Sequence, residues 1–554
     1  MTGENRSRVL TVLGGLLAGT LLVTFFLSPR DSLFTTDSME YLARFWTEPW
    51  HPHHLVWVPV LGWAREGVQW LMPAVGAVEA AQIFQAIVAA SAVILFAAVL
   101  KCRGGVSLPL ACLGALLLAA SRGWRLTAQE TEAYNAAVML FLASVLCAPI
   151  PGAERSRNHY SRIAAAALLF SGAVCVHQVF ALAGIAIFLY YWRPGDAFGR
   201  NALSGIIMAC AAGLLTILAY LAAYATLPDK PGFVPWLTLY SGQLPVFGHW
   251  SHFSSLYQVN RLVANLLAAV AFDPVPMIKA AATHGLTVPL LGKMSMAVGY
   301  LLWATLWAAA LGGVFSRHAL YRFFGAWYLW FELFQWYWAP WLLQMQTLVL
   351  PAAVGGVILG AGALSDRFPA ALRAKPWAAA SAWLAVMLIL GIQVIAPAPL
   401  GHVSMREARD FFAKNDTTLR ESEPWVMMLY GYGDSYPYAI AANARPHPHA
   451  KIFVIENRSP AWVQLRDKNK AVNAGAGAVE AGGAFLVHKS MLLADGGEGE
   501  VERILADVQQ KNGRGALHSS MLSATDGTTI ALELRAPAVA EGSNNRIKDS
   551  TLVR

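Results

Sequence analysis

Long apolar segments dominate the first 400 residues of this chain. A helix needs about 20 predominantly apolar residues to cross the hydrocarbon core of a bilayer. Segments of this kind lie near residues 9–27, 78–100, 106–121, 131–149, 162–176, 178–192, 201–227, 296–315, 319–338, 341–362 and 377–397. The pattern therefore predicts an α-helical polytopic membrane protein with about eleven spans.

A polar interruption separates two of these segments. The stretch 162–192 is long enough for one helix, but its middle reads Cys175-Val176-His177-Gln178. We predict two short helices joined at a polar hinge. If the N-terminus is cytoplasmic, this division leaves every inside loop basic, as the positive-inside rule requires. The basic residues of those loops are Lys101, Arg103, Arg155, Arg157, Arg162, Arg193, Arg200, Arg317, Arg322, Arg367, Arg373 and Lys375.

The first apolar segment resembles a signal peptide, since Arg6 and Arg8 precede it. No small-residue cleavage site follows, so we expect it to be retained as a helix. Residues 28–72 and 228–295 then fall on the outside, which favours a multi-pass protein of the inner (plasma) membrane.

Two stretches of these outside loops predict helices that lie in the membrane interface. Residues 55–72 mix three tryptophans with Arg65 and Glu66, and tryptophan prefers the headgroup level. Residues 261–272 are apolar but too short to span. Residues 1–399 together form the predicted transmembrane domain.

The composition changes near residue 400, where the long apolar runs stop. Residues 400–536 predict a small α/β domain on the periplasmic or extracytoplasmic side, and residues 537–554 a disordered tail. The strands expected in the α/β domain are residues 425–430, 450–456, 484–489 and 528–534. One helix is expected at residues 501–511. No glycine motif in this domain has the form of a nucleotide-binding fingerprint.

Composition supports the membrane assignment. Of 554 residues, 56% are hydrophobic and 13% charged, against roughly a quarter charged in soluble domains. The net charge of +8 is accounted for by basic loops near anionic headgroups, and no basic-aromatic run indicates nucleic acid. The five cysteines lie in or beside apolar segments without metal-binding spacing, which is typical of packing residues.

The first outside segment carries the candidate catalytic acid. Asp37 lies shortly beyond the first predicted span, between Thr36 and Ser38 and ahead of a loop rich in tryptophan and histidine. A carboxylate at the rim of a wet cavity can act as a general base on an acceptor hydroxyl or amine. A solvated surface acid is the alternative, at about even odds by the same argument.

The next outside loop adds acids and arginines. Arg122 and Arg125 are suited to clamp a phosphate or an anionic headgroup. Glu130 and Glu132 lie at the predicted start of the following helix. Stabilisation of a helix N-terminus by acidic side chains accounts for one glutamate. It does not account for Glu132, which enters the apolar segment, where polar groups tend to be functional.

Histidines form a third group, His51, His53 and His54, around Pro52. A metal site is the weaker interpretation, because no further ligand is set by the spacing. We expect contacts to a phosphate, or packing beside Trp50 and Trp57. A divalent metal remains possible, and no other cofactor is indicated.

His177 and Gln178 at the hinge face the same side as these histidines. A structural histidine is the commoner case, but these residues can line the same cavity. Glu332 lies in an aromatic turn, where helix pairing through hydrogen bonds is favoured over a sugar-binding platform.

Taken together, these motifs resemble the GT-C superfamily of polytopic membrane glycosyltransferases, which includes protein O-mannosyltransferases and lipid A aminoarabinose transferases. The features that carry the resemblance, over roughly residues 1–400, are Asp37 in the first outside loop, HPHHLVW (51–57), QETEAY (129–134), VHQ (176–178) and ELFQWYWAPW (332–341). Asp37-Ser38 departs from the Asp-Glu pair of the mannosyltransferases, and the C-terminal domain carries no resemblance.

The resemblance implies a polyprenyl-phosphate-linked sugar as donor, Asp37 as the catalytic base, a basic residue at the donor phosphate, and a glycan, lipid or protein acceptor. We therefore expect sugar transfer on the extracytoplasmic side. Two alternatives are a lipid or solute transporter (flippase), although no inverted repeat is evident, and a non-catalytic envelope assembly protein.

Overall fold

The structure is a computed structural model. It describes residues 50–152, 158–194, 199–227, 232–237, 256–270, 288–338 and 343–365, with short pieces at 19, 21–23, 32–33, 38 and 41–42. Further on it describes residues 403–404, 406–415, 424–430, 438, 450–455, 461–491, 497–512, 517–523 and 529–535. The chain divides into two compact units, Met1–Ser404 and Met405–Arg554.

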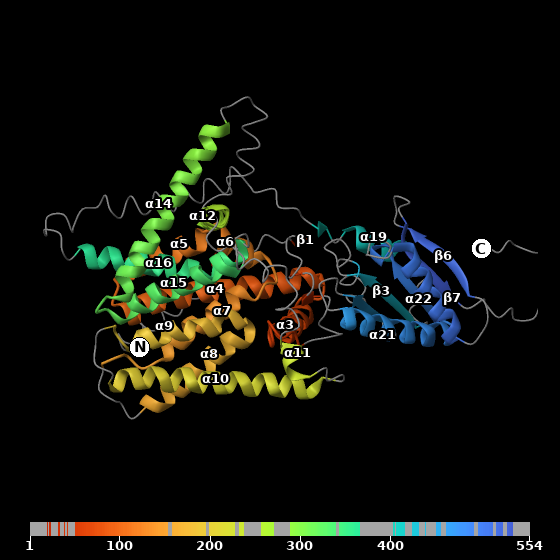
Figure 1. The fold of residues 1–554 in the computed structure, drawn as a ribbon, viewed down its shortest axis with the longest axis horizontal. Helices are drawn as coiled ribbons and strands as arrows, with labels where there is room; N and C mark the ends of the chain where they lie inside the picture. Colours follow the sequence, from red (N-terminus) through yellow and green to blue (C-terminus); the bar gives the residue numbers. More distant parts are fainter. Residues whose placement is uncertain are drawn as a thin grey trace, which may run out of the picture. The chain divides into compact units, whose positions relative to one another are not determined.

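The first unit is a helical bundle (Figure 1). α4 packs against α3, α5 and α7, and the row continues from α7 through α8 to α10. α9, α14, α15 and α16 pack beside this row, and α12 contacts α14 and α16. The helices are α3 (Trp57–Leu71), α4 (Ala77–Gly104), α5 (Leu108–Ala120), α6 (Arg122–Gln129), α7 (Tyr134–Cys147), α8 (His159–Val176), η1 (Gln178–Ala183), α9 (Gly184–Tyr191), α10 (Arg200–Thr226), α11 (Phe233–Leu237), α12 (Leu256–Val270), α14 (Val288–Val314), α15 (Ala319–Trp338) and α16 (Leu343–Ser365).

The predicted hinge is present. α8 ends at Val176, and His177 has an extended backbone with φ −148° and ψ 108°. The 3-10 turn η1 follows at once and leads into α9. The polar pair at 177–178 thus marks a real break between two helices.

Arginines from different helices stabilise one end of the bundle. Arg103 donates to the carbonyls of Leu146 and Ala148, the latter at 2.7 Å, and Arg162 donates to Cys147 and Ala148 at 3.0 and 2.9 Å. These carbonyls end α7 and have no partner further along the helix. Cations there also favour the negative end of the helix dipole.

Arg322 does the same for α9. Its guanidinium donates to the carbonyls of Leu189 at 2.9 Å and Tyr190 at 3.3 Å, and to those of Ser316 and Arg317 at 2.9 Å each. The described parts of the predicted loops that hold Arg103, Arg162 and Arg322 therefore meet at one end of the bundle. Which end faces the cytoplasm stays a prediction.

The outer faces of several helices are apolar. On α10, Leu214 and Ile217 are 59% and 56% exposed, and on α14 Leu301 is 70% exposed. Four described helices are long and apolar enough to cross a membrane, namely Ala77–Gly104, His159–Val176, Asn201–Thr226 and Lys293–Val314. Large exposed apolar surfaces of this kind are typical of lipid contact. The predicted total of about eleven spans is not confirmed, because the other apolar helices in the described residues are shorter and the segments 9–27 and 377–397 lie largely outside them.

α3 has an inverted polarity that fits the predicted interfacial helix. Arg65 is 2% exposed, whereas Trp63 and Trp70 are 60% and 81% exposed. A helix on a water-exposed surface would expose its arginine to solvent and bury its tryptophans against the protein. This arrangement favours lipid at the outer side of α3, but its place in the membrane remains a prediction.

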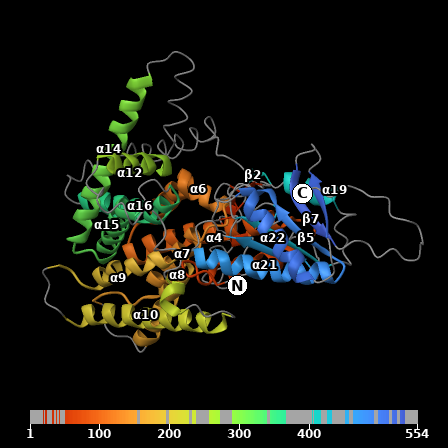
Figure 2. The same ribbon diagram turned by 45° about the vertical axis from the view of Figure 1, so that its right-hand side comes forward.

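The second unit is a five-stranded sheet with helices (Figure 2). The strand order is β4-β3-β5-β7-β6; β4, β3 and β5 are parallel, and β7 and β6 are antiparallel to their neighbours. The elements are α19 (Arg406–Lys414), β3 (Trp425–Tyr430), β4 (Ala450–Ile455), α21 (Ala461–Glu480), β5 (Ala484–His488), α22 (Gly497–Asn512), β6 (His518–Ser523) and β7 (Thr529–Arg535).

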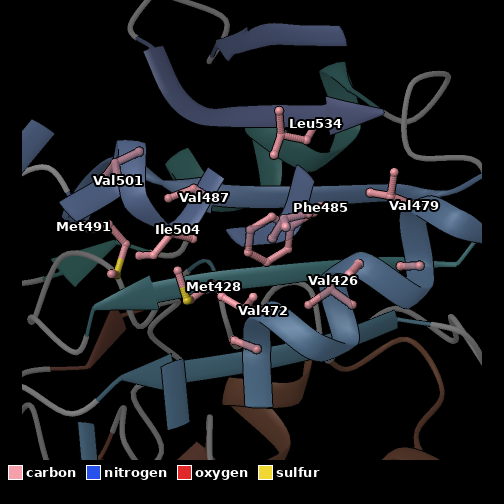
Figure 3. Close-up of a cluster of buried hydrophobic side chains, with 14 of the residues drawn as sticks. Val426, Met428, Val472, Val479, Phe485, Val487, Met491, Val501, Ile504 and Leu534 are labelled. Carbon is pink, nitrogen blue, oxygen red and sulfur yellow. The ribbon is translucent and has the colours of Figure 1, made fainter. Parts of the chain in front are cut away.

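The core of this unit lies between one sheet face and the helices α21 and α22. Alternate strand residues such as Val426, Phe485 and Leu534 meet Val472 and Ile504 from the helices (Figure 3). The sheet is small, but it buries a complete apolar layer, as the expected α/β domain requires.

We predict that Arg322→Leu lowers the stability of the bundle, because four carbonyls lose their donor. Net losses of about 1 kcal/mol per hydrogen bond suggest a total of roughly 2–4 kcal/mol. The measurement is the thermal unfolding midpoint of the detergent-solubilised protein. Arg317→Leu, at an exposed neighbour, is the matched control. Equal midpoints for the two variants would contradict the capping role.

Candidate functional site

The first outside segment is tied to the connection between α6 and α7. Thr131 makes two hydrogen bonds to Ser38: its N–H donates to Ser38 Oγ at 3.2 Å, and its Oγ1 donates to the Ser38 carbonyl at 2.8 Å. The Thr131 carbonyl accepts a third hydrogen bond, from Trp57 Nε1 at 2.7 Å. Ser38 and Thr131 are fully buried. Asp37 itself lies outside the described residues, but it directly precedes Ser38 in the chain.

The α6–α7 connection buries the two glutamates. α6 ends at Gln129 and α7 begins at Tyr134, so Glu130 and Glu132 lie in a break between helices, 2% and 1% exposed. Such a break leaves backbone carbonyls without helical partners.

Two glutamines of α4 satisfy these carbonyls. Gln85 Nε2 donates to the carbonyls of Thr127 and Glu132 at 3.0 and 2.8 Å and to Asn135 Oδ1 at 3.2 Å, and Gln82 Nε2 donates to Gln129 at 3.0 Å. The backbone of the connection that carries the two acids is thus held by neutral side chains of α4.

The histidine loop joins the hinge of α8. The N–H of Gln178 donates to the His53 carbonyl at 3.1 Å, and the N–H of Val56 donates to the Cys175 carbonyl at 3.2 Å. Tyr220 of α10 donates its hydroxyl to the Pro52 carbonyl at 2.7 Å. The structure therefore brings together residues that are 119 to 168 positions apart in the sequence, as the hypothesis of a common site requires.

The imidazole rings of this loop and the hinge lie close to one another. His54 lies 4.6 Å from His177 and 5.3 Å from His51, centroid to centroid. Tyr41 packs edge-on against His54 at 5.1 Å, and Tyr134 lies 4.9 Å from His177. The histidines thus form one aromatic cluster that adjoins the first turn of α7.

Burial keeps these histidines uncharged. It lowers the pKa of His53 to about 4. Burial, with smaller effects of His177 and His53, lowers the pKa of His54 well below its usual value, and a hydrogen bond to Val176 opposes the shift. At neutral pH His53 and His54 therefore offer hydrogen bonds and no positive charge.

The arginines occupy different positions. Arg122 is buried and donates through Nη1 to the Ala268 carbonyl of α12 at 3.3 Å, while Arg125 is half-buried on α6. Arg65 of α3 was not selected from the sequence. The Arg65 side chain is buried. Burial lowers the pKa of Arg65 to about 10, and the neighbouring Glu66 opposes this shift, so Arg65 stays cationic at neutral pH.

Glu332 belongs to a second polar cluster, on α15. Trp303 of α14 and Gln346 of α16 face its fully buried carboxyl group. The preceding residue, Phe331, packs on Phe180 of η1 at 5.4 Å. Among the described residues, the two carboxyl oxygens of Glu332 have no hydrogen-bond partner, so helix pairing through this group stays a prediction.

Several members of the site were missed in the sequence. Ser38, Thr131, Gln82 and Gln85 have the shortest polar contacts around the acids. Gln82 and Gln85 carried a signal, since they are polar residues three apart inside an apolar segment. Thr131 carried none, because a threonine among glutamates is unremarkable in a loop.

No group of three or more His, Cys, Asp or Glu side chains among the described residues has the geometry to hold a metal ion. The His51–His54 rings stack with one another rather than converge on a point. The residues that the structure describes therefore do not form a metal site.

No protein-family model matches the sequence, and neither does any curated protein. Among solved structures, ArnT from Cupriavidus metallidurans bound to undecaprenyl phosphate is similar with a TM-score of 0.53 and 13% identity, over 96% of this chain and 99% of that one. The Archaeoglobus fulgidus oligosaccharyltransferase, in complex with Zn and sulfate, is similar with a TM-score of 0.50 and 12% identity, over 95% of this chain and 74% of that one.

Both proteins are membrane glycosyltransferases of the GT-C superfamily. At this level of identity the likeness concerns the fold. The chain is a multi-pass membrane protein with the GT-C fold and a small C-terminal sheet unit, and the resemblance seen in its motifs is confirmed to that extent.

We predict that acid destabilises this end of the bundle through His53. Because its folded pKa of about 4 lies below its usual 6.5, the stabilisation is present above pH 6.5 and is lost as the pH falls towards 4. At pH 5 the loss is about 2 kcal/mol for this group. The measurement is the unfolding midpoint of wild type and His53→Gln from pH 7.5 to 5.

The unfolding midpoint of His53→Gln should fall less between pH 7.5 and pH 5 than the midpoint of the wild type. His518→Gln, at an exposed histidine of the second unit, is the control and should follow wild type. Parallel curves for wild type and His53→Gln would contradict the prediction.

Proposed function

We propose that this protein is a glycosyltransferase that moves a sugar from a polyprenyl-phosphate donor to an acceptor on the extracytoplasmic side of the inner membrane. The observation that carries the proposal is the pair of hydrogen bonds between Ser38 and Thr131 within a GT-C fold. These bonds bring the segment next to Asp37 against the buried glutamates. The acceptor is a glycan, a lipid or a protein.

Asp37 acts as the general base in this proposal. Asp37 directly precedes Ser38 in the chain, and the backbone and hydroxyl of Ser38 are both engaged by Thr131. Glu130 and Glu132 flank Thr131 in the sequence. Three carboxylates therefore belong to two segments that are directly hydrogen-bonded to each other.

The transfer step needs little covalent chemistry from the protein. The acceptor hydroxyl gives its proton to Asp37 while its oxygen forms a bond to the anomeric carbon of the sugar. The bond from that carbon to the phosphate oxygen breaks, and its electron pair leaves with the polyprenyl phosphate. Alignment of the two reactants and compensation of the phosphate charge are the main contributions.

The remaining residues have supporting roles. Glu130 and Glu132 orient the acceptor. The phosphate partner is one of Arg65, Arg122 or Arg125. Arg65 has the strongest support, because it is a buried cation on the helix that begins at Trp57, and burial strengthens its attraction for an anion.

The first test of this proposal is Asp37→Asn, which removes the base and keeps the shape. We expect transfer to fall by about 10²–10⁴-fold, as for loss of a general base. The assay measures transfer from radiolabelled polyprenyl-phosphate sugars in membranes that contain the protein. Asp507→Asn, at an exposed acid of α22 in the second unit, is the control. Full activity in Asp37→Asn would exclude Asp37 as the base, and uptake of labelled lipid without transfer would favour a flippase.

The second test concerns positioning by Thr131. Thr131→Val removes the 2.8 Å bond to the Ser38 carbonyl and preserves the side-chain volume. We expect about tenfold slower transfer, because the loss of one buried hydrogen bond is worth about 1–2 kcal/mol. Thr131→Ser should retain most of the activity. Similar rates for the Val and Ser variants would show that this bond does not position the base.

A further inference from the structure

The backbone fixes which nitrogen of His54 carries the proton. Its Nδ1 lies 3.2 Å from the Val176 carbonyl oxygen, which can only accept a hydrogen bond. The hydrogen of the neutral ring is therefore on Nδ1. The other nitrogen, Nε2, has a lone pair and acts only as an acceptor.

The opposite assignment holds for His177. Its Nδ1 lies 3.4 Å from the backbone N–H of Val179, which can only donate. The ring hydrogen is therefore on Nε2, which acts as a donor. His177 caps η1 by this bond, so its tautomer follows from the break in the helix.

The two neighbouring rings thus carry opposite hydrogen-bonding groups at Nε2, an acceptor on His54 and a donor on His177. Their centroids are 4.6 Å apart with planes at 87°, and each residue keeps a small accessible area, 8% for His54 and 5% for His177. The Tyr41 and Tyr134 rings pack against them at 5.1 and 4.9 Å. One acceptor and one donor, both uncharged, are held rigidly by backbone contacts.

This combination fits a sugar hydroxyl better than a phosphate. A hydroxyl both donates and accepts, so it can engage His54 Nε2 and His177 Nε2–H together. A phosphate oxygen only accepts and would meet the lone pair of His54 without a proton. Anions prefer cationic, donor-rich surroundings, which the arginines supply.

We infer that His54 and His177 form a subsite for a hydroxyl group of the transferred sugar, separate from the group that binds the phosphate. The inference rests on the proposed glycosyltransferase function. It makes the histidines determinants of sugar recognition, with no role in proton removal from the acceptor.

The variants His54→Asn and His177→Asn test this subsite. An asparagine amide can occupy the position of Nδ1 in either ring: it donates to Val176 in the first case and accepts from Val179 in the second. Each variant therefore keeps the local backbone bond and removes the group at Nε2 together with the ring contact to Tyr41 or Tyr134. His159→Asn, at the opposite end of α8, is the matched control.

Binding is measured with the full-length protein in detergent. The probes are undecaprenyl phosphate and the same lipid phosphate bearing mannose, glucose or galactose. In wild type, at least one sugar-bearing lipid should bind more tightly than the bare lipid. In both test variants its affinity should fall about tenfold, with little change for the bare lipid. Unfolding midpoints close to wild type would show that the backbone bonds persist.

The other outcomes overturn the inference in distinguishable ways. An equal loss for bare and sugar-bearing lipids, or no loss at all, would exclude a sugar subsite at these histidines. The same holds if wild type binds the bare lipid and prefers no sugar form. Wild type that binds neither kind of lipid would contradict the glycosyltransferase proposal itself, and the subsite with it.

Discussion

The need to satisfy backbone polar groups where helices are interrupted governs this structure. Within an apolar bundle, a carbonyl or N–H released by a break has no water to bind, so another part of the protein must supply its partner. The breaks at His177 and at residues 130–133 meet this need with His54, Gln85 and Trp57. The partners that satisfy the breaks are also the residues that assemble the candidate site.

At the two ends of the bundle, different kinds of side chain satisfy the released backbone carbonyls. At one end Arg103, Arg162 and Arg322 cap the carbonyls of α7 and α9. At the other end most partners are neutral imidazoles, amides and hydroxyls, and one is the buried Arg122, which donates to the Ala268 carbonyl. Neutral partners can satisfy the released carbonyls without adding charge beside the buried glutamates.

The sequence predicted those elements whose residues have one common structural role, such as long apolar runs that form helices. Apolar runs predicted most described helices to within a few residues, and β3, β4, β5 and β7 fell on the expected apolar stretches. β6 was missed because HSSMLS is a polar edge strand, and α21 because its alanines and glycines show no strong apolar face. Arg65 was visible as a charge beside tryptophans, but only the fold shows that it is buried and the tryptophans are outside. The contact of Ser38 with Thr131 had no sequence signal, since hydroxyl residues are common in loops and their partners depend on tertiary packing.

The order of breaks along the chain explains how distant segments share one site. α8 runs from the arginine-rich end to His177, the chain turns there, and α9 returns to the carbonyls bound by Arg322. The turn at His177 therefore lies at the end opposite to the arginines, where α4 supplies Gln85 and the histidine loop docks. A single continuous helix across 162–192 would carry the residues after 177 past this level, and the N–H of Gln178 would bond within the helix instead of to the His53 carbonyl. The polar hinge, more than any one titratable residue, is what makes a site at this end of the bundle possible.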